Sequence, residues 1–242
     1  MSDATGDHDD RPEGGSVVVP TATVPGQRSL TRRVLRPMLR SWLRVRAEGP
    51  EHVPAEGPVL IAATHRSHAD SIALALAAGR PVHFLGDLAL TRSPLVGPLL
   101  PKLGMVPLRR GEVDTAALDV VRSLIGQGHA VVVYPEGSRS RDGSVHRLRS
   151  GVARVAAELA VPVVPAGLEG IERAWPVGQH PRLTGARVTV RFAEARVAPA
   201  DTPKARRTFN MALQQQLAEL SRSPMVDSFA PVGGGDAGGG AV

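Results

Sequence analysis

The chain has 242 residues, a length that suits one domain of ordinary size together with terminal tails. It contains no cysteine, which excludes disulfides, thiolate metal sites, a cysteine nucleophile and a thioester intermediate on the enzyme. The formal net charge of +6 favours anionic partners, whereas the low aromatic content (3%) and the lack of a zinc-finger or RNA-recognition motif argue against nucleic acid.

The two ends of the sequence read as tails. Residues 1–28 are rich in small and acidic residues without periodicity, which predicts a disordered N-terminal segment. Their acidic start, with no apolar run after a basic region, is unlike a secretory signal. Residues 223–242 include two Gly-Gly-Gly runs and predict a disordered, Gly-rich C-terminal tail.

Residues 29–46 predict a basic amphipathic helix, because apolar residues recur at helical spacing and arginines occupy mostly the other faces. Pro37 interrupts the pattern, so we expect a kink or a helix start near it. This stripe favours contact with a membrane surface, and the alternative is a helix that packs its stripe on the domain. No stretch approaches the roughly 20 apolar residues of a bilayer span. The stripe consists of Leu30, Val34, Leu35, Met38, Leu39, Trp42 and Leu43.

Residues 47–222 predict one layered α/β domain with a mainly parallel central sheet flanked by helices, because strand-like and helix-like segments alternate along them. The expected strands are 57–63, 81–85, 104–109, 129–134, 161–167 and 186–193. The expected helices are 69–79, 93–102, 114–127, 150–159 and 203–222.

A histidine and an aspartate follow the first expected strand of this domain, at His65 and Asp70. Five residues of regular helix would turn the two side chains roughly 140° apart. They can therefore meet only if His65 lies in the loop and Asp70 in the first helical turn. A histidine braced by a carboxylate is a general base with its orienting partner. The alternative is a surface loop with incidental polar residues.

Other strand ends carry polar side chains as well. Arg109 and Arg110 end the expected strand 104–109, and Glu136 and Arg139 follow the expected strand 129–134. Because sites in α/β sheets form outside the carboxyl ends of parallel strands, we expect these groups to converge near His65.

Four ordered motifs resemble the 1-acylglycerol-3-phosphate acyltransferase family: His65 with Asp70, Gly104 with Arg110, Tyr134 to Ser140, and the apolar, proline-bearing segment Val161 to Pro165. The resemblance covers roughly residues 45 to 195. Four positions depart from the family pattern. Arg109 stands where many members carry an acidic residue, which makes the phosphate end of the site more positive. Thr64 stands in place of asparagine, Tyr134 in place of phenylalanine and Ser138 in place of threonine.

The resemblance implies transfer of a fatty acyl group from acyl-CoA or acyl carrier protein to the free hydroxyl of lysophosphatidic acid, giving phosphatidic acid. His65 would take the proton of the hydroxyl, and Asp70 would fix the imidazole tautomer. No cofactor is implied beyond the thioester co-substrate. An oxyanion donor is expected among the backbone amides of the His65 loop or near Gly137. The expected substrate-binding residues are Arg110, Glu136, Gly137, Ser138, Arg139 and Arg149.

Three alternatives stay open. The acceptor could be another lyso-lipid or a glycolipid, or the chain could be a non-catalytic membrane-binding homologue. A metal-dependent hydrolase could use His65, His68, Asp70 and Glu136 as ligands, although their spacing matches no familiar zinc signature. The expected location is cytoplasmic, peripheral on the inner face of the cell membrane.

Overall fold

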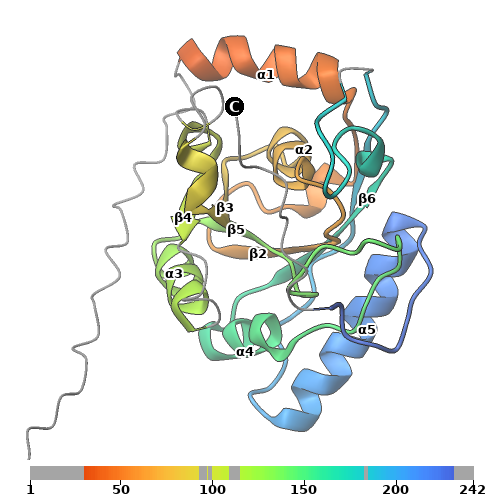
Figure 1. Ribbon diagram of the computed structural model, residues 1–242. Coiled ribbons are helices and arrows are strands. Elements are labelled where there is room, and N and C mark those ends of the chain that lie inside the picture. The colour runs from red at the N-terminus through yellow and green to blue at the C-terminus, as the bar shows by residue number, and fades with distance from the viewer. Residues whose placement is uncertain (1–29, 93–96, 98–99, 109–114, 183–184, 232–242) are drawn as a thin grey trace, which may run out of the picture.

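The structure is a computed structural model that describes residues 30–92, 97, 100–108, 115–182 and 185–231 (Figure 1). Its centre is a seven-stranded sheet in the order β1-β7-β6-β2-β5-β3-β4. All neighbouring strands are parallel except β6 and β7. The strands are β1 (Arg46–Glu48), β2 (Val59–Ala63), β3 (Val82–Asp87), β4 (Met105–Leu108), β5 (Ala130–Val133), β6 (Val163–Glu169) and β7 (Thr189–Phe192).

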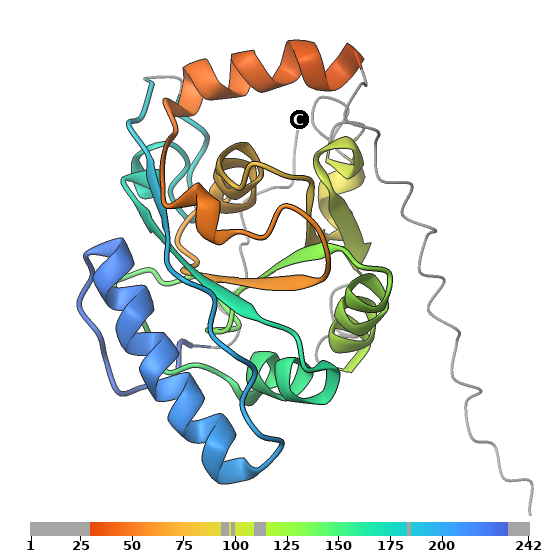
Figure 2. The same cartoon turned by 180° about the vertical axis from the view of Figure 1, so that it is seen from behind.

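Helices cover both faces of the sheet (Figures 1 and 2). One face carries α1 (Leu30–Leu43) and α2 (Asp70–Ala77), and the other carries α3 (Thr115–Gly126), α4 (Ser150–Leu159) and α5 (Pro203–Ser221). The predicted layered α/β domain with a mainly parallel sheet is therefore confirmed.

The central strand β2 is buried along its whole length because both of its faces are covered. Its side chains alternate between two cores, as the period of two in a strand requires. Val59 and Ile61 pack with α1 and α2, whereas Leu60 and Ala62 pack with α3, α4 and α5. A continuous apolar run at residues 59–63 is thus what a doubly covered parallel strand needs.

Most predicted elements are confirmed, the helix at 150–159 to the residue. Two differences concern the sheet. The strand β1 was not predicted, because it has only three residues and lies at the sheet edge. The last two strands, β6 and β7, are antiparallel because no crossover helix joins them. The predicted helix 93–102 lies largely outside the described residues, and its described end is a 3₁₀ turn at Pro101–Leu103.

Other differences concern the termini. Helix α1 runs through Pro37, so it does not begin there. The predicted N-terminal tail lies outside the described residues. The C-terminal tail was predicted to begin at 223, but the segment after α5 pairs with the loop before α4. The amide N–H of Val145 donates to Pro224 O at 2.8 Å, and that of Arg147 donates to Ser228 O at 2.9 Å. The start of that predicted tail is therefore too early.

Candidate active site

Two neighbouring strands bring the loops of the candidate site together. Strands β2 and β5 are parallel and adjacent, with Ala62 opposite Val133, so both strands end at the same edge of the sheet. The loop after β2 contains His65, and the loop after β5 contains the Pro-Glu-Gly-Ser-Arg-Ser sequence. One backbone hydrogen bond, from Ser140 N–H to His65 O at 2.8 Å, ties them to each other.

His65 and Asp70 form a hydrogen-bonded pair. His65 lies in the loop, Asp70 is the first residue of α2, and His65 Nδ1 is 2.8 Å from Asp70 Oδ2. The same carboxylate oxygen accepts the backbone N–H groups of Arg66 at 2.7 Å and Ser67 at 2.9 Å. Asp70 is fully buried, whereas the His65 side chain keeps 16% of its surface exposed. A carboxylate accepting from Nδ1 leaves the Nε2 lone pair as the basic position of the ring.

Tyr134 supports the other side of the imidazole. The two rings stack with centroids 3.8 Å apart and planes 16° from parallel. The Tyr134 hydroxyl is hydrogen-bonded to Ser71 Oγ at 2.7 Å, on the helix that begins with Asp70. Burial raises the pKa of Tyr134, so the phenol stays neutral. The ring of His65 is thus fixed by a carboxylate at its edge and an aromatic face beneath it.

Glu136 is a buried brace between loops. Its side chain is completely buried, and its two carboxylate oxygens accept the backbone N–H groups of His65 at 3.3 Å and His146 at 3.0 Å. Burial raises the pKa of Glu136 to about 7, against the opposing effect of these hydrogen bonds. Glu136 was expected either to hold an arginine in place or to touch the acceptor glycerol. The second role does not fit this structure, because the side chain is completely buried.

The buried Glu136 predicts a pH dependence of stability that Glu136→Gln removes. The folded-state pKa of about 7 exceeds the ordinary value of 4.5, so the folded protein holds this proton more tightly than the unfolded chain. The contribution is full below pH 4.5 and is lost as the pH rises through 7, by about 3 kcal/mol. Denaturant unfolding of both proteins across this range measures it. The free energy of unfolding of the exposed control Glu172→Gln should follow the wild type at every pH. The same pH dependence in Glu136→Gln as in the wild type would contradict the raised pKa of Glu136.

Arg139 and Ser138 occupy the turn that faces His65. Arg139 lines the same pocket as His65 and Tyr134, so its guanidinium is placed for an anionic substrate group. Ser138 Oγ is buried and has no hydrogen-bond partner among the described residues.

Gly137 and Arg149 differ from their expected places. Gly137 has φ of +79°, and the Arg149 side chain packs where a ligand was expected, since a Cβ on Gly137 would lie 2.5 Å from Arg149 Nε. Arg149 does not line the pocket that holds His65. Arg109 and Arg110 lie outside the described residues.

Several backbone amides that were expected as oxyanion donors already form hydrogen bonds within the protein. The amide N–H groups of His65, Arg66 and Ser67 donate to buried carboxylates, and that of Gly137 donates to Tyr134 O. These four are used within the protein, so a donor near Gly137 has to come from a later residue of the turn. Thr64, the departure nearest to His65, has its Oγ1 bonded to Leu168 N–H and fastens β2 to β6.

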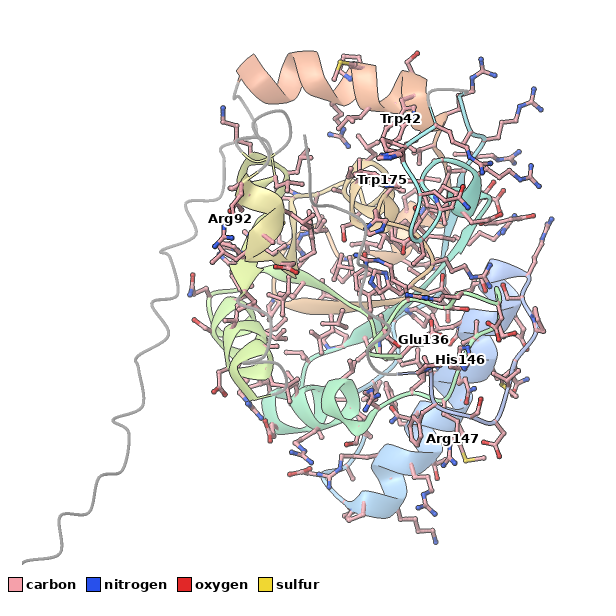
Figure 3. The ribbon with its side chains drawn as sticks, in the orientation of Figure 1. Trp42, Arg92, Glu136, His146, Arg147 and Trp175 are labelled. Atoms are coloured by element: carbon pink, nitrogen blue, oxygen red, sulfur yellow. The ribbon has the colours of Figure 1, made fainter. Side chains whose placement is uncertain are left out.

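An apolar pocket of about 440 Å³ begins at His65 and was not foreseen from the sequence. It lies between α1, the start of α2 and the ends of β3 and β4, with Trp175 on a further side. Trp42 and Trp175 lie on the same side of Glu136 in Figure 3. The side chains that line this pocket come from segments far apart in the chain, so no local sequence pattern could predict it. The apolar lining includes Leu39, Trp42, Ile72, Phe84, Leu85, Leu90, Leu100, Leu103, Met105 and Trp175.

The residues of the alternative metal site do not assemble in the described chain. His68 packs against Trp175, with ring centroids 5.2 Å apart. Within the described residues, no three histidine, aspartate or glutamate side chains are grouped to hold a metal ion.

Comparison with known proteins places this fold and site in a family. The model of a family described as acyltransferase matches residues 44–169, which contain both loops of the site. The chain belongs to the acyltransferase family. This match, together with the relatives described next, confirms the resemblance to 1-acylglycerol-3-phosphate acyltransferases seen in the sequence.

Three relatives show how far the likeness extends. A chloroplastic 1-acyl-sn-glycerol-3-phosphate acyltransferase of Arabidopsis thaliana is 31% identical over 154 residues, 62% of this chain and 42% of that protein. A 1-acyl-sn-glycerol-3-phosphate acyltransferase of Borreliella burgdorferi is 24% identical over 132 residues, 52% of this chain and 53% of that protein. An uncharacterised Mycobacterium tuberculosis protein is 29% identical over 160 residues, 62% of this chain and 44% of that protein. The chain thus spans about half the length of these relatives or less.

One solved structure shares the fold. The 1-acyl-sn-glycerophosphate acyltransferase PlsC of Thermotoga maritima aligns with a TM-score of 0.61 and 24% identity. The alignment covers 78% of this chain and 80% of that chain.

Proposed function

We propose that the chain transfers a fatty acyl group from a thioester, acyl-CoA or acyl carrier protein, to the free hydroxyl of lysophosphatidic acid. The observation that carries the proposal is the His65–Asp70 pair, 2.8 Å apart, at one end of an apolar pocket that also contains Arg139. The similarity to the 1-acyl-sn-glycerol-3-phosphate acyltransferases of Arabidopsis and Borreliella supports the same reaction.

The proposed chemistry needs one base. The acceptor hydroxyl gives its proton to His65 Nε2 while its oxygen attacks the thioester carbon. Asp70 stabilises the imidazolium through Nδ1, and the stacked Tyr134 face adds a cation–π attraction. The tetrahedral oxyanion then collapses, the C–S bond breaks, and the departing thiolate takes the proton from His65. An ester and a thiol result, and no further cofactor takes part.

The pocket fits the acyl chain. Its wall is aliphatic and aromatic, and transfer of apolar surface from water favours binding by about 25 cal/mol per Å². Met105 closes one part of the wall by packing on Gly86, where a Cβ would lie 2.4 Å from its sulfur. Arg139, on the turn at the His65 end, would bind the acceptor phosphate with its planar guanidinium.

Helix α1 is the proposed membrane contact. Leu39 and Leu43 are buried in the domain. Trp42 and Met38 both line the pocket, and Met38 is also 59% exposed, two residues before the exposed Arg40. No helix among the described residues is long and apolar enough to cross a bilayer. An exposed apolar residue flanked by arginine suits an anionic lipid surface, so we place the protein peripherally on the inner, cytoplasmic face of the cell membrane.

A thiol-release assay with one acyl-CoA and a panel of lyso-acceptors in anionic vesicles tests the function. We expect lysophosphatidate to give the fastest release. Arg139→Ala should raise the KM for lysophosphatidate about tenfold or more while leaving that for uncharged monoacylglycerol unchanged. Sedimentation of the same vesicles should carry the protein down.

Three results of this assay would contradict parts of the proposal. Thiol release at the buffer rate with every acceptor and either donor would contradict the function. Faster release with a glycolipid would move the acceptor to the alternative class. Protein that stays in the supernatant would contradict the membrane contact.

A further inference from the structure

A second pocket, of about 320 Å³, lies between α4, α5 and the segment after α5, and the proposed chemistry does not use it. Figure 3 shows Arg147 beside α5, on the opposite side of Glu136 from Trp42 and Trp175. The second pocket and the apolar pocket have no lining residue in common, so they are separate. Four arginines line the second pocket, namely Arg147, Arg154, Arg206 and Arg207.

The positive charge of this second pocket is only partly neutralised. Asp227 lies 3.4 Å from Arg147, and Asp201 pairs with Arg206, but both acids lie outside the lining. Glu158 pairs with Arg122 and also interacts electrostatically with Arg154 and Arg206, so it offsets part of the charge of the pocket. The described lining itself contains no acidic residue.

The arginines that point to a ligand are Arg154 and Arg207. Within the described residues neither forms a hydrogen bond or a close ion pair, and both side chains belong to exposed residues. Two guanidinium groups of this kind on one concave surface favour a phosphate-bearing ligand.

The start of α4 adds to the attraction for an anion. Ser150, its first residue, lines the second pocket, and the N-cap residue Arg149 makes no side-chain cap. The first amide N–H groups of a helix lack partners within the helix, and the helix dipole makes that end positive. Phosphate oxygens are the usual ligands of such an end when basic side chains stand beside it.

Two further features indicate a planar ring with hydroxyl or amino groups. Phe229 is 52% exposed, and Arg147 covers it from 5.0 Å, which leaves much of the ring accessible for stacking. Asn210 lines the pocket, and its buried Oδ1 has no hydrogen-bond partner, whereas its Nδ2 donates to Arg149 O. An unsatisfied buried acceptor calls for a donor from a ligand. Phosphate, ring and donor together describe a phosphorylated nucleoside.

A series of side-chain and backbone contacts connects this pocket with His65. Phe229 lies 5.8 Å from the Arg149 guanidinium, and the Arg149 side chain packs on Gly137. Gly137 N–H donates to Tyr134 O, and Tyr134 stacks on His65. The second pocket and the base therefore lie at opposite ends of one short series of contacts.

We propose that the second pocket binds the nucleotide end of acyl-CoA, with its phosphates on Arg154, Arg207 and the start of α4 and its base against Phe229. The proposal rests on the proposed function and goes beyond it by choosing acyl-CoA over acyl carrier protein as the donor. The thioester end would then extend past Arg149 and Gly137 toward His65.

The test compares the variant Arg154→Ala/Arg207→Ala with the matched control Arg173→Ala/Arg187→Ala, which removes two exposed arginines that line neither pocket. Calorimetry with adenosine 3′,5′-bisphosphate should show binding to the wild type and control, weakened about tenfold or more in the first variant. The KM for acyl-CoA should rise by a similar factor, whereas the KM for the same acyl group on pantetheine should not change. Phe229→Leu, which keeps an apolar side chain but loses the ring, should also weaken bisphosphate binding.

Each other outcome overturns the proposal. The wild type could fail to bind the bisphosphate, both double variants could bind it equally, or acyl carrier protein could be the only active donor. Arg154→Ala/Arg207→Ala could instead weaken binding to anionic vesicles without affecting the bisphosphate, which would assign the pocket to lipid head groups. The calorimetry needs no turnover, so failure of the proposed acyl transfer is seen separately.

Discussion

His65→Ala is expected to lower kcat for acyl transfer by about 10²–10⁴-fold, the usual contribution of a positioned general base. The imidazole lies at the end of the apolar pocket, where a buried carboxylate and a stacked ring hold it. Its loss leaves the pocket and Arg139 in place, so the KM for lysophosphatidate should change little. Initial rates of thiol release with saturating acyl-CoA and lysophosphatidate measure the effect.

A matched control removes a histidine elsewhere. His180 is exposed and lines neither pocket, so His180→Ala should retain wild-type kinetics. Equal rates of thiol release for His65→Ala and His180→Ala would show that His65 is not the general base.

Asp70→Asn is expected to have the second largest effect, lowering kcat by about 10²-fold or more with little change in KM. One oxygen of Asp70 accepts three N–H groups, from His65 Nδ1, Arg66 and Ser67. If the asparagine turns its amide N–H toward His65, Nδ1 has to accept that hydrogen bond. The ring hydrogen then lies on Nε2, and Nε2 can no longer accept the proton of the acceptor hydroxyl. An asparagine that keeps its oxygen there buries an amide with no partner, at a cost of about 1–3 kcal/mol in the free energy of unfolding.

The control for Asp70→Asn is Asp119→Asn. The Asp119 side chain is 65% exposed and pairs with Arg122 on the surface of α3, so its loss should affect neither rate nor stability by much. A thermal unfolding scan and kcat measured together separate the two effects at Asp70. Wild-type kcat in Asp70→Asn would show that the carboxylate does not control the imidazole.

Much of the fold followed from local patterns. The apolar run at 59–63 and the amphipathic repeat at 150–159 reflect burial on two faces and on one face, which sequence periodicity reports directly. The meeting of His65 with Asp70 was also predictable, because only a loop followed by a first helical turn lets residues five apart touch.

The parts that the sequence did not reveal depend on contacts between distant segments. Glu136 was expected to hold an arginine in place or to touch the acceptor glycerol, but its carboxylate accepts the backbone amides of His65 and His146 inside the protein. Gly137 was expected to admit a ligand, but the Arg149 side chain takes that space. Such outcomes depend on tertiary packing, which spacing along the chain does not encode.

The double-mutant cycle of His65→Ala with Asp70→Asn tests the central claim most directly. If Asp70 acts on the reaction only through the His65 imidazole, the double variant should have the same kcat for lysophosphatidate acylation as His65→Ala alone. Losses that multiply in the double variant would show that the two side chains act independently, and the account of a braced imidazole as the base would be wrong.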